Sequence, residues 1–133
     1  MTDRELADLA YAMLSRSYVP YSKFPVGAAL LCADGSVFTG CNIENAAYGS
    51  TICAERTALV KAVSEGHRDD FVRLAVVGES ADYCWPCGAC RQMLYEFAPE
   101  LELLVGKADR SFTKLKLCDL LPHGFGPKDL SLG

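Results

Sequence analysis

Apolar positions in the first twenty residues recur every three or four places, which is the spacing of a helix with one buried face. The apolar positions are Leu6, Leu9, Ala10, Met13 and Leu14, and Ser17 falls on the same face. Thr2 and Glu5 have the spacing of a capping box, in which each side chain satisfies a backbone N–H of the other residue. The pattern therefore predicts a helix that begins near Thr2 and stops before Pro20, and that covers one face of a sheet.

Two apolar runs follow, at 26–33 and 37–43, with Asp34 and Gly35 between them. Glycine adopts positive φ at little cost, so this pairing predicts a β-hairpin. The residues at 27–31 (Gly-Ala-Ala-Leu-Leu) show no alternation of apolar and polar side chains. A strand of that kind is expected to be buried on both faces.

The rest of the chain alternates between helical and extended patterns. We expect helices from about 53 to 66 and from about 87 to 97, with strands at 74–77, 101–105 and 113–117. Helices between strands in the middle of a chain imply parallel crossovers. The order predicts an α/β fold, a three-layer α/β/α sandwich with a mixed five-stranded sheet. With 133 residues, the whole range 1–133 is expected to be one domain.

The charge balance bears on the class of partner. The chain carries 13 basic and 17 acidic residues, for a net charge of −4. Polynucleotide binding needs clustered Lys and Arg, so a small substrate is favoured over nucleic acid. The opening residues are polar and no apolar run reaches the ~18 residues of a membrane span, so no membrane role is expected. Seven cysteines in a chain of this type are expected to be reduced, in the cytoplasm.

Two short segments carry the candidate chemistry. Cys87 and Cys90 lie three residues apart at a predicted helix start, so their thiols share one face. Cys53 opens the other predicted helix and can supply a third thiolate if the two helix starts converge. Three thiolates suit Zn²⁺ with a fourth position left for water. Helix dipoles directed at the cluster would offset its negative charge.

Glu55 is too close in sequence to Cys53 to be a comfortable fourth ligand. It is well placed to take a proton from metal-bound water and pass it to a substrate nitrogen, which is consistent with hydrolytic deamination. Arg56 is expected to donate to a thiolate sulfur, with Arg91 as the alternative. A closed structural site with Cys84 as the fourth ligand is the competing interpretation.

With these segments the chain resembles the small homotetrameric zinc-dependent cytidine deaminases, over nearly its whole length. The resemblance lies in Phe24-Pro25-Val26-Gly27-Ala28, Asn42-Ile43-Glu44-Asn45, Cys53-Ala54-Glu55-Arg56, Pro86-Cys87-Gly88-Ala89-Cys90-Arg91-Gln92 and Phe125. It implies hydrolysis of cytidine and deoxycytidine to uridine and deoxyuridine in pyrimidine salvage. It also implies a homotetramer with sites shared between subunits.

The resemblance also implies roles for single residues. Cys53, Cys87 and Cys90 would hold zinc, and Glu55 would shuttle the proton. Asn42 and Glu44 would hydrogen-bond the sugar 3′-hydroxyl, while Phe24 and the backbone of Ala54 would contact the base. Tyr48 and Phe125 would enter a neighbouring subunit's site, Phe125 by stacking on the pyrimidine.

Other interpretations remain open from the sequence. The chain could deaminate a related aminopyrimidine nucleoside such as blasticidin S, or be a zinc-stabilised module without turnover. Trp85 departs from the family pattern, which has a smaller residue before the Pro-Cys pair, and it bears on substrate preference. The other cysteines, Cys32, Cys41 and Cys118, are expected to be small core residues. The two histidines, His67 and His123, are expected to be solvated, and neither needs to bind zinc.

Overall fold

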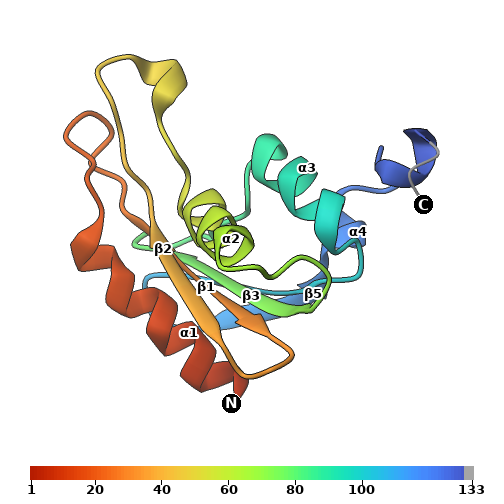
Figure 1. The fold of residues 1–133 in the computed structure, drawn as a ribbon. Coiled ribbons are helices and arrows are strands. Elements are labelled where there is room, and N and C mark those ends of the chain that lie inside the picture. Colours follow the sequence, from red (N-terminus) through yellow and green to blue (C-terminus); the bar gives the residue numbers. More distant parts are fainter. Residues whose placement is uncertain (131–133) are drawn as a thin grey trace.

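Five strands form one mixed sheet in the order β2-β1-β3-β4-β5 (Figure 1). The structure, a computed structural model, describes residues 1–130. The strands are β1 (Val26–Cys32), β2 (Val37–Cys41), β3 (Phe71–Gly78), β4 (Glu102–Gly106) and β5 (Phe112–Lys116). β3 and β4 pair in parallel, and the other neighbours are antiparallel. This confirms the predicted mixed sheet.

Helices cover both faces of the sheet. They are α1 (Asp3–Ala12), α2 (Ala54–Ser64), α3 (Gly88–Phe97) and α4 (Leu117–Leu120). Short 3₁₀ helices span Met13–Arg16, Tyr48–Ser50 and Pro127–Leu130. α1 lies on one face, and α2 and α3 lie on the other (Figure 1). The architecture is therefore the expected three-layer sandwich. None of the helices within residues 1–130 is long and apolar enough to cross a membrane.

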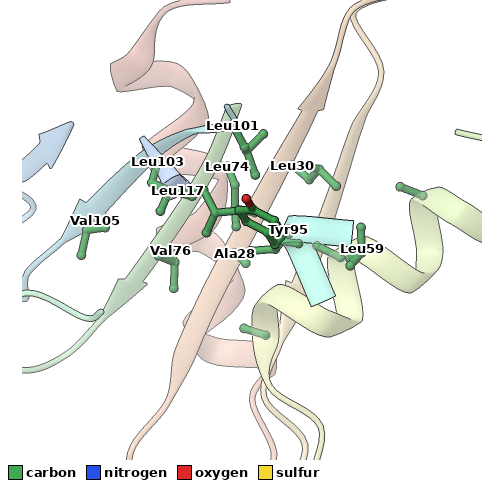
Figure 2. Packing of buried hydrophobic residues seen from close by; sticks show 14 of the residues in the cluster. Ala28, Leu30, Leu59, Leu74, Val76, Tyr95, Leu101, Leu103, Val105 and Leu117 are labelled. Carbon is green, nitrogen blue, oxygen red and sulfur yellow. The ribbon is translucent and has the colours of Figure 1, made fainter. Parts of the chain in front are cut away.

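The central strands carry a separate core on each face, as the unbroken apolar run in β1 predicts. Ala28 and Leu30 face α2 and α3, together with Leu74, Leu103 and other buried side chains (Figure 2). Ala29 and Leu31 point the opposite way, into the cluster under α1. Successive side chains of a strand alternate between faces, so a strand covered on both sides must be apolar throughout.

Two parallel crossovers determine where the functional segments meet. The chain passes from β2 through α2 to β3, and from β3 through α3 to β4. Both helices thus begin beyond the carboxyl ends of strands, the edge at which α/β sheets bind ligands. Gly40 in β2 permits the close approach of α2, because a Cβ there would collide with the carbonyl oxygen of Ala54.

The first helix turns a different face inward from the one its pattern predicts. Leu9 is 37% exposed, whereas Ala7 and Tyr11 are buried with Leu6 and Ala10. The Tyr11 hydroxyl donates to the carbonyl of Lys107 across the sheet edge, which brings that ring inward.

The ends of two later elements also differ from the expectation. β3 begins at Phe71, earlier than expected, and α4 replaces the end of the last predicted strand. Asp119 initiates α4 by accepting a hydrogen bond from the Lys116 N–H at 3.1 Å.

Candidate metal centre and active site

Three cysteine sulfurs converge where α2 and α3 begin. The Sγ atoms of Cys53 and Cys87 are 3.7 Å apart, and those of Cys87 and Cys90 are 3.4 Å apart. All three lie within 4.8 Å of one another. A tetrahedral zinc ion with Zn–S bonds of ~2.3 Å separates its sulfurs by about 3.8 Å. The sequence-predicted trio is therefore brought together at a spacing that one zinc ion fits.

The helix ends place these thiols. Cys53 and Cys87 are the N-cap residues of α2 and α3, and both have extended backbone conformations. Cys90 lies in the first turn of α3, beside Cys87 on the same face. Free backbone N–H groups and the positive ends of two helix dipoles therefore face the cluster, which favours negative charge on the sulfurs.

Hydrogen bonds among the three thiols shift their pKa values, and a bound cation would take the place of the shared protons. A hydrogen bond with Cys90, followed by the Arg56 guanidinium, lowers the pKa of the Cys53 thiol to about 5. The same hydrogen bond and burial raise the pKa of Cys90. Three adjacent thiolates repel one another, so all three ionise together only around a cation. The donor set fits a thiophilic divalent ion such as zinc.

Glu55 lies in the first turn of α2 and is only 4% exposed. Burial raises the pKa of its carboxyl to about 7, and negative charge at Cys53 adds to the rise. A carboxyl that titrates near neutral pH can both accept and return a proton during turnover. Glu55 also lines the same cavity as Cys53 and Cys87, which places it where a reacting water would lie.

The competing closed site does not form among the described residues. The three-sulfur cluster includes neither Cys84 nor a carboxylate. Cys84 lies instead against Gly78 at the end of β3, and burial raises the pKa of its thiol to about 12. The Sγ of Cys84 is not among the sulfurs that lie within 4.8 Å of one another, so within residues 1–130 no fourth side chain takes the remaining coordination position.

The two arginines make different contacts. Arg56 directs Nη2 to the carbonyl of Thr51 at 3.2 Å and to the Sγ of Cys53 at 3.5 Å. Arg91 instead donates to the carbonyls of Pro86 and Leu120, which joins the segment just before α3 to the end of α4. Of the two candidates, the guanidinium that touches a thiol is that of Arg56.

A cavity of about 170 Å³ opens beside the sulfurs. Its walls include Phe24, Asn42, Ala54 and Glu55, all singled out from the sequence, and also Thr51 and Trp85. A second cavity of about 370 Å³ is lined by Tyr21, Ser22, Glu44, Tyr48 and Thr51. Thr51 lines both cavities, so the two are neighbours. Sequence reasoning missed Thr51, because a lone threonine in a loop carries no distinguishing signal.

Asn42 and Glu44 are held by backbone groups. The Asn42 amide accepts from the Val26 N–H at 2.9 Å and donates to the Phe24 carbonyl at 2.8 Å. One oxygen of Glu44 accepts from the N–H groups of Tyr21 and Ser22. Hydrogen bonding, chiefly to Ser22, lowers the pKa of Glu44, so its carboxylate is charged at neutral pH. Each side chain keeps further hydrogen-bonding capacity for a ligand.

Tyr48 and Phe125 are both exposed aromatic side chains. Tyr48 is 74% exposed and Phe125 is 56% exposed, and neither lines the cavity that holds Glu55. Tyr48 packs edge-on against Tyr21, with ring centroids 5.6 Å apart. The backbone of Phe125 accepts a hydrogen bond from Gln92 on α3.

The geometry agrees with comparisons to known proteins. Residues 1–104 match the family model described as the cytidine and deoxycytidylate deaminase zinc-binding region. The chain belongs to this cytidine deaminase family. The resemblance stated from the sequence is thereby confirmed, and so is a zinc-binding region, for which Cys53, Cys87 and Cys90 supply the donor set.

Several members of the cytidine deaminase family are close relatives. The cytidine deaminase of Halalkalibacterium halodurans is 50% identical over 116 residues, covering 86% of this chain and 87% of its own length. The probable cytidine deaminase of Dictyostelium discoideum is 47% identical over 124 residues, covering 92% and 83% of the two chains. The solved cytidine deaminase of Burkholderia pseudomallei superposes with a TM-score of 0.91 at 46% identity, covering 94% of this chain and all (100%) of that one.

Proposed function

We propose that this chain hydrolyses cytidine and deoxycytidine to uridine and deoxyuridine and releases ammonia. The observation that carries the proposal is the buried Glu55 carboxyl beside the unliganded side of the three-sulfur cluster. The cytidine deaminases that the chain resembles at 46–50% identity support this choice of substrate.

Zinc, when bound by Cys53, Cys87 and Cys90, would supply a water of lowered pKa as the nucleophile. The remaining steps belong to Glu55. Its carboxylate takes a proton from the attacking water and delivers it to N3 of the base while the water oxygen bonds to C4. The carboxylate then carries the second water proton to the departing amine. The C4–N4 bond breaks, and the products are the uracil nucleoside and ammonia.

Binding of the sugar falls to the two polar residues held by backbone. We assign the unbonded oxygen of Glu44 and the spare amide hydrogen of Asn42 to the 3′-hydroxyl. A site built to bind a hydroxyl rejects analogues that lack it, because its polar groups are then left without a partner. Phe24 packs against the base, and the backbone of Ala54 holds the base edge. This arrangement favours nucleosides over free cytosine.

The sites are completed by neighbouring subunits of a homotetramer in this proposal. The support is the exposure of Tyr48 and Phe125, neither of which lines the cavity that holds Glu55 in its own chain. Exposed aromatic side chains of this size are typical of interfaces. We assign Phe125 to stacking on the pyrimidine of an adjacent site and Tyr48 to its wall.

The cell compartment and the extent of the domain complete the proposal. Three adjacent thiols need a reducing compartment, which favours the cytoplasm. Residues 1–133 act as one domain.

The function is tested by incubating zinc-loaded protein with cytidine, deoxycytidine, cytosine and blasticidin S, and measuring ammonia release. We expect turnover of the two nucleosides and almost none of cytosine. If blasticidin S were the one compound of the four to be deaminated, the proposal that cytidine and deoxycytidine are the substrates would be wrong. Zinc-replete protein inert toward all four compounds would favour a binding module.

A further inference from the structure

A second group of metal-ligating side chains lies at the other end of the sheet. Cys32, His67 and Asp70 bring one sulfur, one ring nitrogen and one carboxylate oxygen within 4.8 Å of one another. β1 has seven residues, from Val26, which lines the cavity beside the three sulfurs, to Cys32, so its ends are about 20 Å apart. The turn after Cys32 lies at the opposite end of the hairpin from the 3₁₀ helix Tyr48–Ser50 (Figure 1). This group is therefore separate from the deaminase site.

The backbone fixes the three residues relative to one another. Cys32 ends β1 at a β-bulge and pairs with Phe71, the first residue of β3. The Ala33 N–H donates to the Asp70 carbonyl at 2.8 Å. His67 follows α2, and its N–H donates to the Ala62 carbonyl at 3.1 Å. Three segments of the chain thus meet here with little freedom, which preorganises the donor atoms.

The side chains are more enclosed than the sequence indicates. Cys32 is 2% exposed, and the side chain of His67 is 17% exposed rather than solvated. The His67 ring packs edge-on against Phe38, with centroids 5.2 Å apart. One Asp70 oxygen lies 2.7 Å from Nδ1 of His67. Its other oxygen is buried without a hydrogen-bond donor among residues 1–130, a costly arrangement.

We infer that Cys32, His67 and Asp70 form a second zinc site, which ties the β1–β2 hairpin to the connection between α2 and β3. Sulfur, imidazole nitrogen and carboxylate oxygen are the three ligand types that zinc accepts. A thiolate and a carboxylate together neutralise Zn²⁺, so the enclosed set carries no net charge. The ion would also give the unpartnered Asp70 oxygen a partner.

Asp34 lies at the rim of the cluster, beside the position that a fourth ligand would take. Asp34, in the β1–β2 turn, has one oxygen bonded to the Ser36 N–H and the other 4.0 Å from Nε2 of His67. It is the more exposed of the two aspartates, with a side chain 56% exposed. We place a water in the fourth position, with the exposed Asp34 carboxylate as its hydrogen-bond acceptor, so that only one thiolate and one carboxylate bind the ion itself.

This site should bind zinc more weakly than the three-cysteine site. Burial, with the charges of Asp70 and Asp34, raises the pKa of Cys32 to about 11. Zinc must therefore displace a firmly held proton from the sulfur, and it must also replace the hydrogen bond between His67 and Asp70.

The alternative is an ordinary ion pair between His67 and Asp70, with Cys32 as an apolar filler. That alternative does not need sulfur, whereas a zinc site does. Cys32→Ala and Asp70→Asn therefore separate the two interpretations. The matched controls are Cys118→Ala and His123→Asn, which change a cysteine and a histidine outside the cluster.

The test is equilibrium dialysis of the holoenzyme against buffered free zinc, with metal per chain measured by plasma mass spectrometry. We expect Cys32→Ala and Asp70→Asn each to bind one zinc fewer than the unmodified chain, and the two controls to lose none. Both variants should keep the kcat/KM of the unmodified chain. Because the readout is a difference in zinc content, it does not depend on the proposed deaminase activity. Equal zinc content in all five proteins would overturn the inference.

Discussion

Arg56 places Nη2 3.5 Å from the Sγ of Cys53, one helical turn away at the start of α2. Three thiolates around Zn²⁺ carry a net charge of −1, which is costly to bury. The guanidinium offsets part of that charge and fixes the orientation of the ligand. Outer contacts of this kind commonly alter metal affinity by ~10–100-fold.

Arg56→Gln should therefore weaken zinc binding by about 10–100-fold. The measurement is competition with a chelator of known affinity. Arg91→Gln is the matched control, because the Arg91 guanidinium bonds to the carbonyls of Pro86 and Leu120. We expect it to lower stability and to change zinc affinity far less. An equal loss of affinity in both variants would contradict the role assigned to Arg56.

Glu44→Gln should reduce recognition of the sugar. A hydrogen bond to a charged group contributes about 1.5–3 kcal/mol, so kcat/KM for cytidine should fall by ~10–100-fold. Glutamine can still accept from the N–H groups of Tyr21 and Ser22, which keeps the loop in place. The decisive readout is the preference for cytidine over 3′-deoxycytidine, which should shrink in the variant. An unchanged preference would remove Glu44 from the sugar site.

Phe125→Ala tests whether sites are shared between subunits. A chain with Phe125→Ala and a chain with Glu55→Gln should each be nearly inactive alone. Unfolded together and refolded, they should form mixed oligomers in which some sites combine an intact Glu55 with a neighbour's intact Phe125. Recovery of a fraction of normal activity is expected, with light scattering to report the mass. If mixing restores nothing although mixed oligomers form, Phe125 acts within its own chain.

Leu6 and Leu9 offer a matched pair on α1, since the apolar pattern predicts both to be buried. Leu6 is fully buried, whereas Leu9 is 37% exposed. Leu6→Ala should lower the free energy of unfolding by about 2–5 kcal/mol, and Leu9→Ala by less than about 1 kcal/mol. Urea unfolding of the two variants gives both values. Similar losses of unfolding free energy in the two variants would mean that α1 buries the face predicted from the sequence, with Leu9 inside.

The sequence could anticipate features that depend on neighbours along the chain. Cys87 and Cys90 are three residues apart, and their pairing with Cys53 follows once both helices are placed after parallel strands. The unbroken apolar run in β1 likewise predicts a strand covered on both faces, which the structure confirms.

Features that depend on contacts between residues far apart in the chain could not be predicted from the sequence. Tyr11 turns inward because its hydroxyl reaches the carbonyl of Lys107, a partner 96 residues away. His67 is enclosed because the end of α2, the β1 bulge and Phe38 meet there. Thr51 lines both cavities only once the loop before α2 has folded back. The local periodicity of apolar residues carries no information about such contacts between separate segments.

The central claim is that Glu55 moves protons without holding the metal. Glu55→Gln keeps the size of the side chain and removes its capacity to accept a proton. The most direct measurement is therefore its zinc content beside its kcat for cytidine. We predict that the variant holds the same amount of zinc per chain as the unmodified protein and that its kcat is lower by ~10²–10⁴-fold. Loss of a zinc ion together with activity, or normal turnover in the variant, would contradict the account.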